Sequence, residues 1–449
     1  MSPARPSIDR RFLMVMLGAG LLLRLAWQVQ INGSLGAFVG AGESTRVAMA
    51  LAEGRGFADA YFLGSGPTAH LLPVNPMFAG SIMALFGVDT PASNIALLCL
   101  SLAQVGFAYA MLVRLFSRLG VAEVGVRWSL VSLCLLPVFV QREVVDFRYW
   151  EGALAVGLAA ASLAMLAGQE SAASMTLRSK AKAALLAALT FFVSPVAGLA
   201  VVACWAIFSL RTETFGGSLR SAAMVAAAFT LLLGPWAIRN QLALGTPVLV
   251  RSNAGLELAL ANHPAALSDR PTIATFADRI VEIHPYHGKG ARAAMAAAGG
   301  EVAYSRRLGE EAKAWIMANP EGFARLTLGH VRQLYFPESW AYKYNESDRF
   351  NAQRAAIIAL VNALGLISLA FGLATGRRGY ALLAIYFACV TATYAVLQPV
   401  PRYTYLVYAP LMFVAFDGVL RAALVIRRSA GLALRRLIPA RVATDRPAA

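Results

Sequence analysis

Apolar runs of about 20 residues recur along this chain of 449 residues, and they limit its fold more than any other feature. A helix of that length crosses the hydrocarbon core of a bilayer. The composition agrees, because 58% of the residues are hydrophobic and only 14% are charged, whereas a soluble domain carries about 25% charged residues. These values exclude a soluble globular enzyme, a disordered protein and a secreted disulfide scaffold. The chain is predicted to be an all-α polytopic membrane protein.

The apolar runs predict about ten membrane-spanning helices. The segment 74–87 is apolar but too short to span, so we expect an interfacial or re-entrant helix there. The run 182–210 contains Ser194 and Pro195, and since proline ends or kinks a helix, two short helices are expected. The first run is interpreted as a retained signal anchor. The predicted spans are 12–31, 92–116, 126–143, 149–168, 182–194, 196–210, 219–238, 354–374, 379–398 and 403–425.

The charged residues predict how these helices are oriented. Lys and Arg outnumber Asp and Glu by 40 to 24, a net charge of +16, and the pI near 10.1 at first suggests nucleic acid as a partner. Almost all of the excess falls in segments that are cytoplasmic if the N-terminus is inside, as the positive-inside rule expects. The expected partner is therefore the anionic inner leaflet of the lipid bilayer, not nucleic acid. Both termini are predicted to be cytoplasmic.

Two segments between the predicted spans are long enough to carry a site. The longer one mixes polar and apolar residues as a soluble subdomain does, and a helix is expected over 301–328. The predicted parts are an N-terminal membrane module (1–238) with the first outer loop (32–91), a mainly helical outer subdomain (239–353), C-terminal membrane helices (354–425) and a basic cytoplasmic tail (426–449).

Glu43 is the leading candidate for catalysis in the first outer loop. The apolar spacing over residues 43–51 is helical, and glycines 54 and 56 end the helix. A carboxylate at a helix N-terminus is favoured by the helix dipole, and at the membrane boundary it can take a proton from a substrate hydroxyl. The alternative is that Glu43 is only an N-terminal charge. His70, in the GPTAH run of the same loop, is a supporting candidate.

A second group of candidates follows the third predicted span. Asp146, Arg148 and Glu151 surround Tyr149 and Trp150 in this stretch. Charges and large aromatics at one bilayer edge are typical of the rim of a site. They are equally compatible with an interfacial belt of Tyr and Trp with paired charges.

Arginines near the outer ends of later spans are candidates for binding phosphate. Arg239 and Arg251 follow the seventh span, and Arg402, beside Tyr403, lies in a very short outer turn. A guanidinium matches phosphate oxygens bidentately, although anchoring to lipid headgroups explains Arg239 and Arg251 as well. Inside the spans, Arg24 and Asp417 are costly in lipid. They are expected to face a cavity or each other, or, for Arg24, to snorkel outward.

No metal site or cofactor is indicated by the sequence, although a divalent metal is not excluded. The four cysteines each lie inside an apolar run, without a CxxC or Cys/His arrangement. His284 and His287 are three residues apart across a proline but lack the carboxylate pattern of a metal site.

Several short motifs follow one another in a characteristic order. After the early carboxylate come GRGF, GPTAH and an apolar helix ending in LFG, and later PWAIRN, RSNAGLELALANHP and YSRRLGEEAKAWIMANPEGFARLTLGHVRQLYFP. From about residue 12 to residue 410 the chain resembles bacterial membrane glycosyltransferases of the C-type superfamily. It is most similar to those grouped with glycosyltransferase family 39, the dolichyl-phosphate-mannose–protein mannosyltransferase-like proteins.

The resemblance implies transfer of a sugar from a polyprenyl-phosphate carrier to an acceptor on the outer face of the membrane. It implies that Glu43 is the catalytic base and that Arg239 and Arg402 hold the carrier phosphate. Many relatives have an Asp where this chain has Gly40, which puts a two-carboxylate site in doubt unless Asp146 or Glu151 supplies the second acid.

The sequence therefore predicts an inverting glycosyltransferase of the bacterial inner membrane, with its active site facing the periplasm. Its acceptor is a glycan, a lipid or a protein. Two alternatives stay open. One is a transporter or flippase of a lipid-linked sugar, which needs the arginines but no base. The other is a non-catalytic scaffold, which is compatible with Gly40 standing where many relatives have an Asp.

Overall fold

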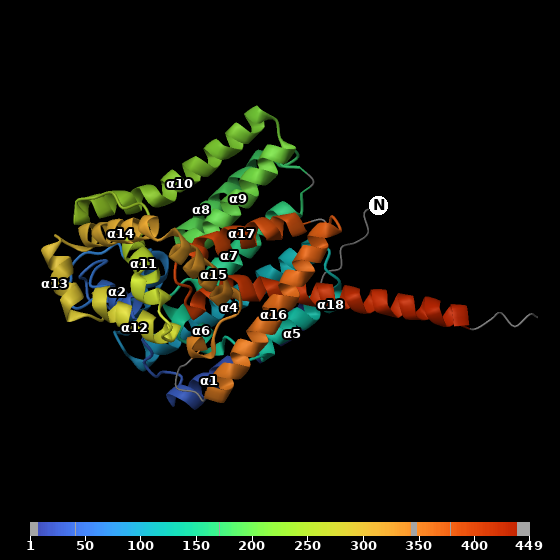
Figure 1. The fold of residues 1–449 in the computed structure, drawn as a ribbon, viewed down its shortest axis with the longest axis horizontal. Helices are drawn as coiled ribbons and strands as arrows, with labels where there is room; N and C mark the ends of the chain where they lie inside the picture. Colours follow the sequence, from blue (N-terminus) through green and yellow to red (C-terminus); the bar gives the residue numbers. More distant parts are fainter. Residues whose placement is uncertain (1–7, 41, 170, 343–347, 378, 438–449) are drawn as a thin grey trace, which may run out of the picture.

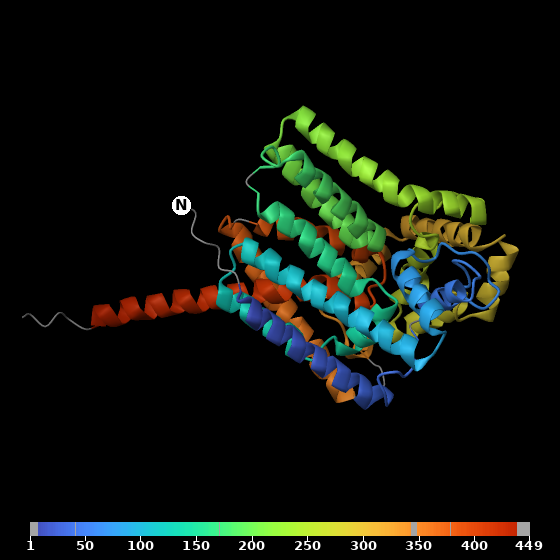
Figure 2. The same ribbon diagram turned by 180° about the vertical axis from the view of Figure 1, so that it is seen from behind.

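The computed structural model describes residues 8–40, 42–169, 171–342, 348–377 and 379–437. These residues form eighteen α-helices and three short 3-10 helices, with no β-sheet among them. The all-α prediction is confirmed. Figures 1 and 2 show a helical bundle with a layer of shorter helices and loops at one end, while the last part of α18 projects from the other end.

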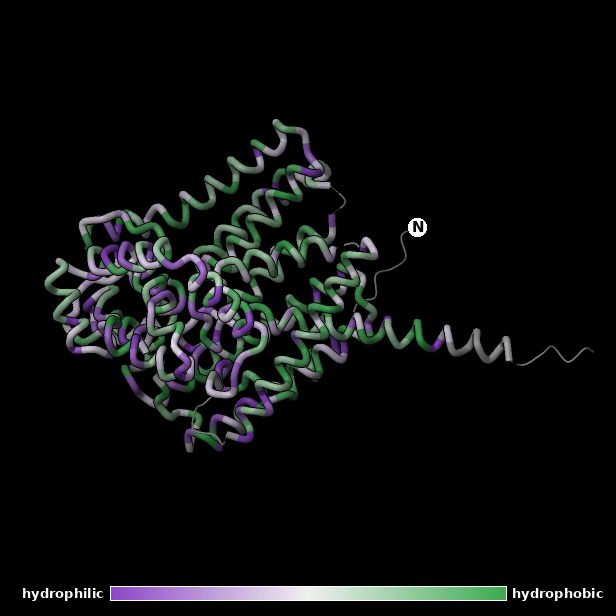
Figure 3. Tube along the Cα trace, viewed as in Figure 1, coloured by the Kyte–Doolittle hydropathy of each residue, from purple (hydrophilic) through white to green (hydrophobic). Residues whose placement is uncertain are grey.

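The bundle is built from apolar helices, and Figure 3 shows that hydrophobic residues dominate it. Six of its helices, α1, α4, α9, α10, α16 and α18, are long and apolar enough to cross a membrane by themselves. The ten predicted spans also include α7, α8 and α17, which are shorter than these six. The bundle helices are α1 (Arg10–Asn32), α4 (Pro91–Arg118), α5 (Glu123–Leu135), α6 (Val140–Val144), α7 (Gly152–Ala167), α8 (Leu177–Val193), α9 (Pro195–Thr212), α10 (Phe215–Leu244), α16 (Asp348–Ala374), α17 (Tyr380–Val396) and α18 (Pro401–Leu437).

The remaining elements form what we call the cap layer, the described residues of 33–90 and 245–342. This layer mixes hydrophilic and hydrophobic residues, as its colouring in Figure 3 shows. Its helices are α2 (Glu43–Ala52), α3 (Val74–Phe86), α11 (Ala254–Ala261), α12 (Thr272–Ile283), α13 (Lys289–Ala297), α14 (Glu301–Ala318) and α15 (Pro320–Tyr335), with the 3-10 helices η2 (Pro264–Leu267) and η3 (Ser339–Tyr342).

Local signals in the sequence located several elements correctly. Helix α2 begins at Glu43, α3 matches the short apolar segment, and the chain breaks at Ser194 between α8 and α9. Two predicted helices are broken instead. The third span bends by 71° between α5 and α6, where Pro137 interrupts the helix, and η1 (Asp146–Arg148) follows. The stretch 301–328 divides between α14 and α15 at Pro320.

The cap layer packs closely around α11 and α14. A Cβ atom added to Gly255 in α11 would meet the carbonyl oxygen of Ser305 in α14 at 1.9 Å, so only glycine allows this approach. The hydroxyl of Ser305 accepts hydrogen bonds from the backbone N–H groups of Gly255 and Leu256. Side chains of the first loop, including Val47 and Tyr61, share one hydrophobic core with Tyr304 of this helix pair.

The charge of Arg24 in α1 is neutralised inside the bundle. Its guanidinium donates to Glu143 of α6 over 2.8 Å and to the Tyr109 hydroxyl of α4 over 3.0 Å. Tyr109 and Tyr405 of α18 both donate to the other oxygen of Glu143. Arg24 is only 3% exposed, so it does not snorkel outward. One carboxylate therefore joins four helices.

Asp417 is paired separately, near the opposite end of the bundle. It accepts hydrogen bonds from Arg377, Arg421 and the Tyr380 hydroxyl. The expectation that Arg24 and Asp417 face each other is therefore wrong, because each has its own partners.

We expect Glu143→Gln to destabilise the protein by about 3–5 kcal/mol, since it leaves the buried Arg24 without a counter-charge. Thermal unfolding in detergent measures the effect. The matched control is Glu123→Gln, whose partner Arg127 is 43% exposed, and which should change stability by less than about 1 kcal/mol. Equal unfolding temperatures for the two variants would show that the buried pair is unimportant.

Candidate functional site

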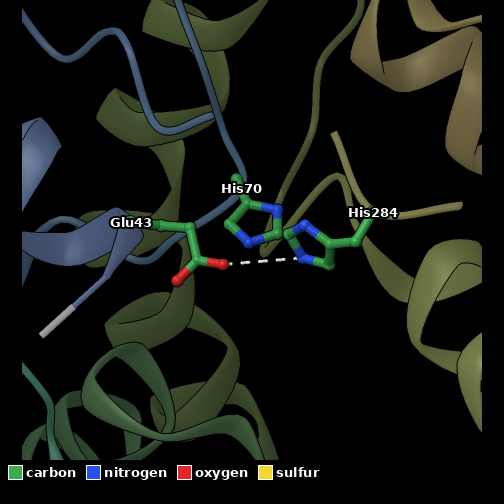
Figure 4. Close-up of side chains that lie close together, drawn as sticks. All are labelled: Glu43, His70 and His284. Carbon is green, nitrogen blue, oxygen red and sulfur yellow. Dashed lines mark ion pairs between the residues drawn. The ribbon is translucent and has the colours of Figure 1, made fainter. Parts of the chain in front are cut away.

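Charged and aromatic side chains meet where the cap layer joins the bundle. Glu43 comes from the start of α2, His70 from the loop before α3, and His284 from the residue after α12. Figure 4 shows these three side chains pointing toward one another. Glu257 of α11 and Arg402 of α18 interact with the same group electrostatically.

The Glu43 carboxylate is the centre of this cluster. The residue before α2, Gly42, has a φ of +70° and provides no side-chain cap, so the carboxylate itself lies at the positive end of the helix. One of its oxygens lies 3.5 Å from Nε2 of His284, and its side chain is 16% exposed. Burial raises its pKa, while a backbone hydrogen bond to the carboxylate and the charges of Arg402, His287 and Arg46 act in the opposite direction.

The two histidines are held in defined orientations. Nδ1 of His70 is 3.0 Å from the Tyr61 hydroxyl, and the His70 and His284 rings meet edge to face at 5.6 Å. Nδ1 of His284 accepts the backbone N–H of Tyr286. In the neutral ring the proton is therefore on Nε2, directed toward Glu43. Burial lowers the pKa of His284 to about 4, so this neutral form is the one present near pH 7.

Glu43, His70 and His284 are also residue types that bind zinc. One possible ligand atom from each lies within 4.8 Å of the other two. However, a histidine that binds a metal must present an unprotonated nitrogen and usually donates its other N–H. His284 has the reverse arrangement, because its Nδ1 is the acceptor. The cluster as it stands is a hydrogen-bonding group and fits a metal poorly.

Glu257 is a second carboxylate at the site, and sequence reasoning missed it. Asn253 donates to it over 3.0 Å. Burial raises the pKa of Glu257 and the charge of Glu43 raises it further, whereas His284, Arg402 and Arg251 lower it. The available signal was its position at the end of the RSNAGLE motif, six residues after Arg251.

Two predicted arginines lie at this cluster with unused donors. Arg402 stacks on the Trp150 ring at 4.1 Å and donates to the Tyr403 hydroxyl, while Arg251 pairs with Glu151 at 2.7 Å. In the part of the chain that the structure describes, the buried Nε atoms of both arginines have no hydrogen-bond partner. An unpaired buried donor is costly, so both Nε groups can still donate to an added acceptor.

Asp146 and Arg148 have different surroundings. Asp146 pairs with Arg142 at 2.7 Å and also interacts electrostatically with Arg402, so it lies at the edge of the site. Arg148 is fully buried and donates to the carbonyl of Val144 and to Gln28 of α1. Its guanidinium is therefore used inside the bundle and does not join Glu43.

Arg239 holds the first loop in place and does not belong to the Glu43 cluster. It donates to the carbonyls of Thr68 and Phe57, at 2.7 and 2.5 Å, and lies over the ring of Trp236. Glu301 of α14 fastens the same loop by accepting hydrogen bonds from the Thr68 hydroxyl and the N–H of Ala69. These contacts position His70, the next residue, and the sequence contained no signal for them.

No family model and no curated protein matches this sequence, but solved structures share its fold. The archaeal oligosaccharyltransferase AglB from Archaeoglobus fulgidus, in complex with an inhibitory peptide and a dolichol-phosphate, matches 96% of this chain with a TM-score of 0.53 and 13% identity. A structure of the same enzyme with Zn and sulfate matches with 11% identity and the same TM-score.

ArnT from Cupriavidus metallidurans bound to undecaprenyl phosphate matches 92% of this chain and 79% of its own, at 14% identity and a TM-score of 0.37. The chain spans about half the length of AglB, since 52% of the AglB chain is covered. The fold expected from the resemblance to C-type glycosyltransferases is thereby confirmed: the chain is a multi-pass helical membrane protein with the fold found in the matched half of AglB.

The tautomer of His284 predicts that the cluster holds no resident metal. Protein dialysed against EDTA should keep its unfolding temperature, and untreated protein should contain far less than one metal ion per chain by mass spectrometry. A matched His70→Ala variant should show the same metal content as the wild type. Stoichiometric zinc that is lost in this variant would contradict the prediction.

Proposed function

We propose that this protein is an integral-membrane glycosyltransferase that moves a sugar from a polyprenyl-phosphate carrier to an acceptor hydroxyl. One observation carries the proposal. Glu43, a largely buried carboxylate at the start of α2, lies in one cluster with two arginines whose buried Nε groups have no partner among the described residues. The set combines a base with an anion site. The fold shared with AglB, whose structure holds a dolichol-phosphate, supports the same reading.

The proposed reaction is a single displacement at the anomeric carbon. The acceptor oxygen attacks this carbon while its proton passes to Glu43, and the bond between the anomeric carbon and the phosphate oxygen breaks. Polyprenyl phosphate leaves with the bonding electrons, and the configuration at the anomeric carbon inverts. The raised pKa of Glu43 brings the carboxylate closer to the operating pH, which makes it a stronger base than an exposed glutamate.

Arg402 and Arg251 are assigned to the carrier phosphate. Charge grows on the leaving phosphate oxygen as the glycosidic bond breaks, and preorganised cationic donors stabilise it. Trp150 and Tyr403 hold the Arg402 guanidinium by stacking, and Glu151 holds Arg251. Arg239, which the family resemblance also implicates, is assigned a structural role because its donors are used by loop carbonyls.

The proposed location is the inner membrane of a bacterium, with both termini in the cytoplasm and the cap layer in the periplasm. The support is the distribution of Lys and Arg, since the positive-inside rule places their excess in the cytoplasm. The proposed substrates are a lipid-linked sugar and a glycan, lipid or protein acceptor, and no cofactor is proposed.

Replacing the base tests the enzyme assignment. In a transfer assay with radiolabelled polyprenyl-phosphate sugars and a membrane extract as acceptor, Glu43→Gln should lower the rate about 100-fold or more while still binding the donor. The control is Glu53→Gln, an exposed acid just after α2, which should keep full activity. Transfer by wild type and Glu43→Gln at equal rates would exclude Glu43 as the base. Donor binding without transfer by wild type would favour a transporter or scaffold.

Replacing one phosphate ligand tests the anion site. Arg402→Gln should lower kcat/KM for the donor about 100-fold, roughly 3 kcal/mol of lost transition-state stabilisation, and weaken binding of undecaprenyl phosphate. Arg270→Gln is the matched control, because the Arg270 side chain is 57% exposed and pairs with the exposed Asp278. Undecaprenyl phosphate binding equally well to all three proteins would remove Arg402 from the phosphate site.

A further inference from the structure

A cavity lies in the cap layer, apart from the Glu43 cluster. It has a volume of about 340 Å³, and its walls come from η2 and α12 on one side and from α15 on the other. The end of α11 and the turn between α17 and α18 form its base, through Leu260 and Gln398. Cavities of about 300 Å³ and above are large enough to bind small ligands.

Two elements contribute residues both to the cavity and to the Glu43 cluster. Leu260 is one helical turn after Glu257 in α11, a rise of about 4.5 Å. Gln398 precedes Arg402 by four residues in the α17–α18 turn, a chain distance of at most about 14 Å. The cavity therefore lies within the length of a few linked units of the Glu43 cluster.

The walls of the cavity offer hydrogen-bonding groups without an excess of charge. Arg325 and Arg332 are balanced by Asp269 and Glu338. Burial lowers the pKa of His263 to about 4, so this ring is neutral near pH 7. The aromatic side chains of Phe276 and Phe336 also line the cavity. Mixed donors and acceptors beside aromatic faces suit an uncharged, polyhydroxylated ligand better than an anion or a lipid tail.

Two side chains that line the cavity, Gln333 and His263, have polar atoms without a hydrogen-bond partner among the described residues. Gln398 donates to Oε1 of Gln333 over 2.6 Å, while Nε2 of Gln333 is buried and has no partner in the part of the chain that the structure describes. The His263 imidazole is 6% exposed and, among the same residues, makes no hydrogen bond. Both groups belong to a site that is polar enough to hold a ligand.

We propose that this cavity binds an uncharged saccharide unit of the acceptor, and that the acceptor of this transferase is therefore a glycan. The inference rests on the proposed glycosyl transfer, since it places the acceptor beside the base. It assigns Gln333 and His263 to acceptor binding and leaves donor binding to Arg402 and Arg251. The bound unit would lie in the cap layer while a neighbouring hydroxyl reaches Glu43.

The first test measures binding without catalysis. Neutral tri- and tetrasaccharides are titrated into the full-length protein in detergent by saturation-transfer NMR. Wild type and the Gln241→Ala control, which changes an exposed glutamine of α10, should bind at least one saccharide. Gln333→Ala and His263→Ala should weaken it roughly tenfold. No saccharide binding to wild type, or equal binding to all four proteins, would overturn the proposal. If wild type instead binds peptides that contain serine and threonine, and the same two variants lose this binding, the acceptor is a protein and not a glycan.

The second test separates this proposal from the transferase assignment. With a labelled polyprenyl-phosphate sugar, Gln333→Ala should raise the KM for a glycan acceptor about tenfold while the KM for the donor and its hydrolysis by water stay unchanged. An unchanged acceptor KM would exclude the cavity even if transfer occurs. If wild type binds saccharides but never consumes the donor, the transferase assignment fails and the cavity remains a saccharide site. Unfolding temperatures equal to wild type confirm that the variants are folded.

Discussion

The hydrogen bonds of Glu143 hold together the part of the bundle on which the site is built. A carboxylate inside hydrocarbon is stable only when its charge and lone pairs are matched, and Arg24, Tyr109 and Tyr405 match those of Glu143. Tyr405 lies one turn after Arg402, and Asp146 follows Glu143 by three residues. The interaction that neutralises Arg24 inside the bundle therefore also helps to fix the positions of Arg402 and Asp146.

The arginines near the site differ in their partners. Arg239 and Arg148 donate to backbone carbonyls and to an amide. Arg402 and Arg251 are held by aromatic rings and by Glu151, and in the described part of the chain the Nε of each has no hydrogen-bond partner. A guanidinium that is already oriented loses little further freedom when it binds an anion, and this is the physical basis for assigning Arg402 and Arg251 to the proposed phosphate site.

Features with local causes were predictable from the sequence. Helix α2 with Glu43 at its start, and the break at Pro195, follow from apolar spacing and proline chemistry. Pro137 has the same chemistry as Pro195, yet the apolar run around it predicts a single helix where the structure bends by 71°. Glu257 and His284 were not placed at the site, because their approach to Glu43 depends on how α11, α12 and α14 pack, which no short motif encodes. The same holds for the contacts of Arg239, which only tertiary structure could reveal.

His284 belongs to the cap layer, yet it lies against the carboxylate of α2. The cap layer is thus not a separable recognition module attached to a finished reaction centre. Exchanging it between proteins, or trimming it, would remove both the His284 contact of Glu43 and the charge of His287 that lowers the pKa of Glu43. Single substitutions in the cavity walls leave the surroundings of Glu43 intact, whereas replacement of the whole layer would remove them.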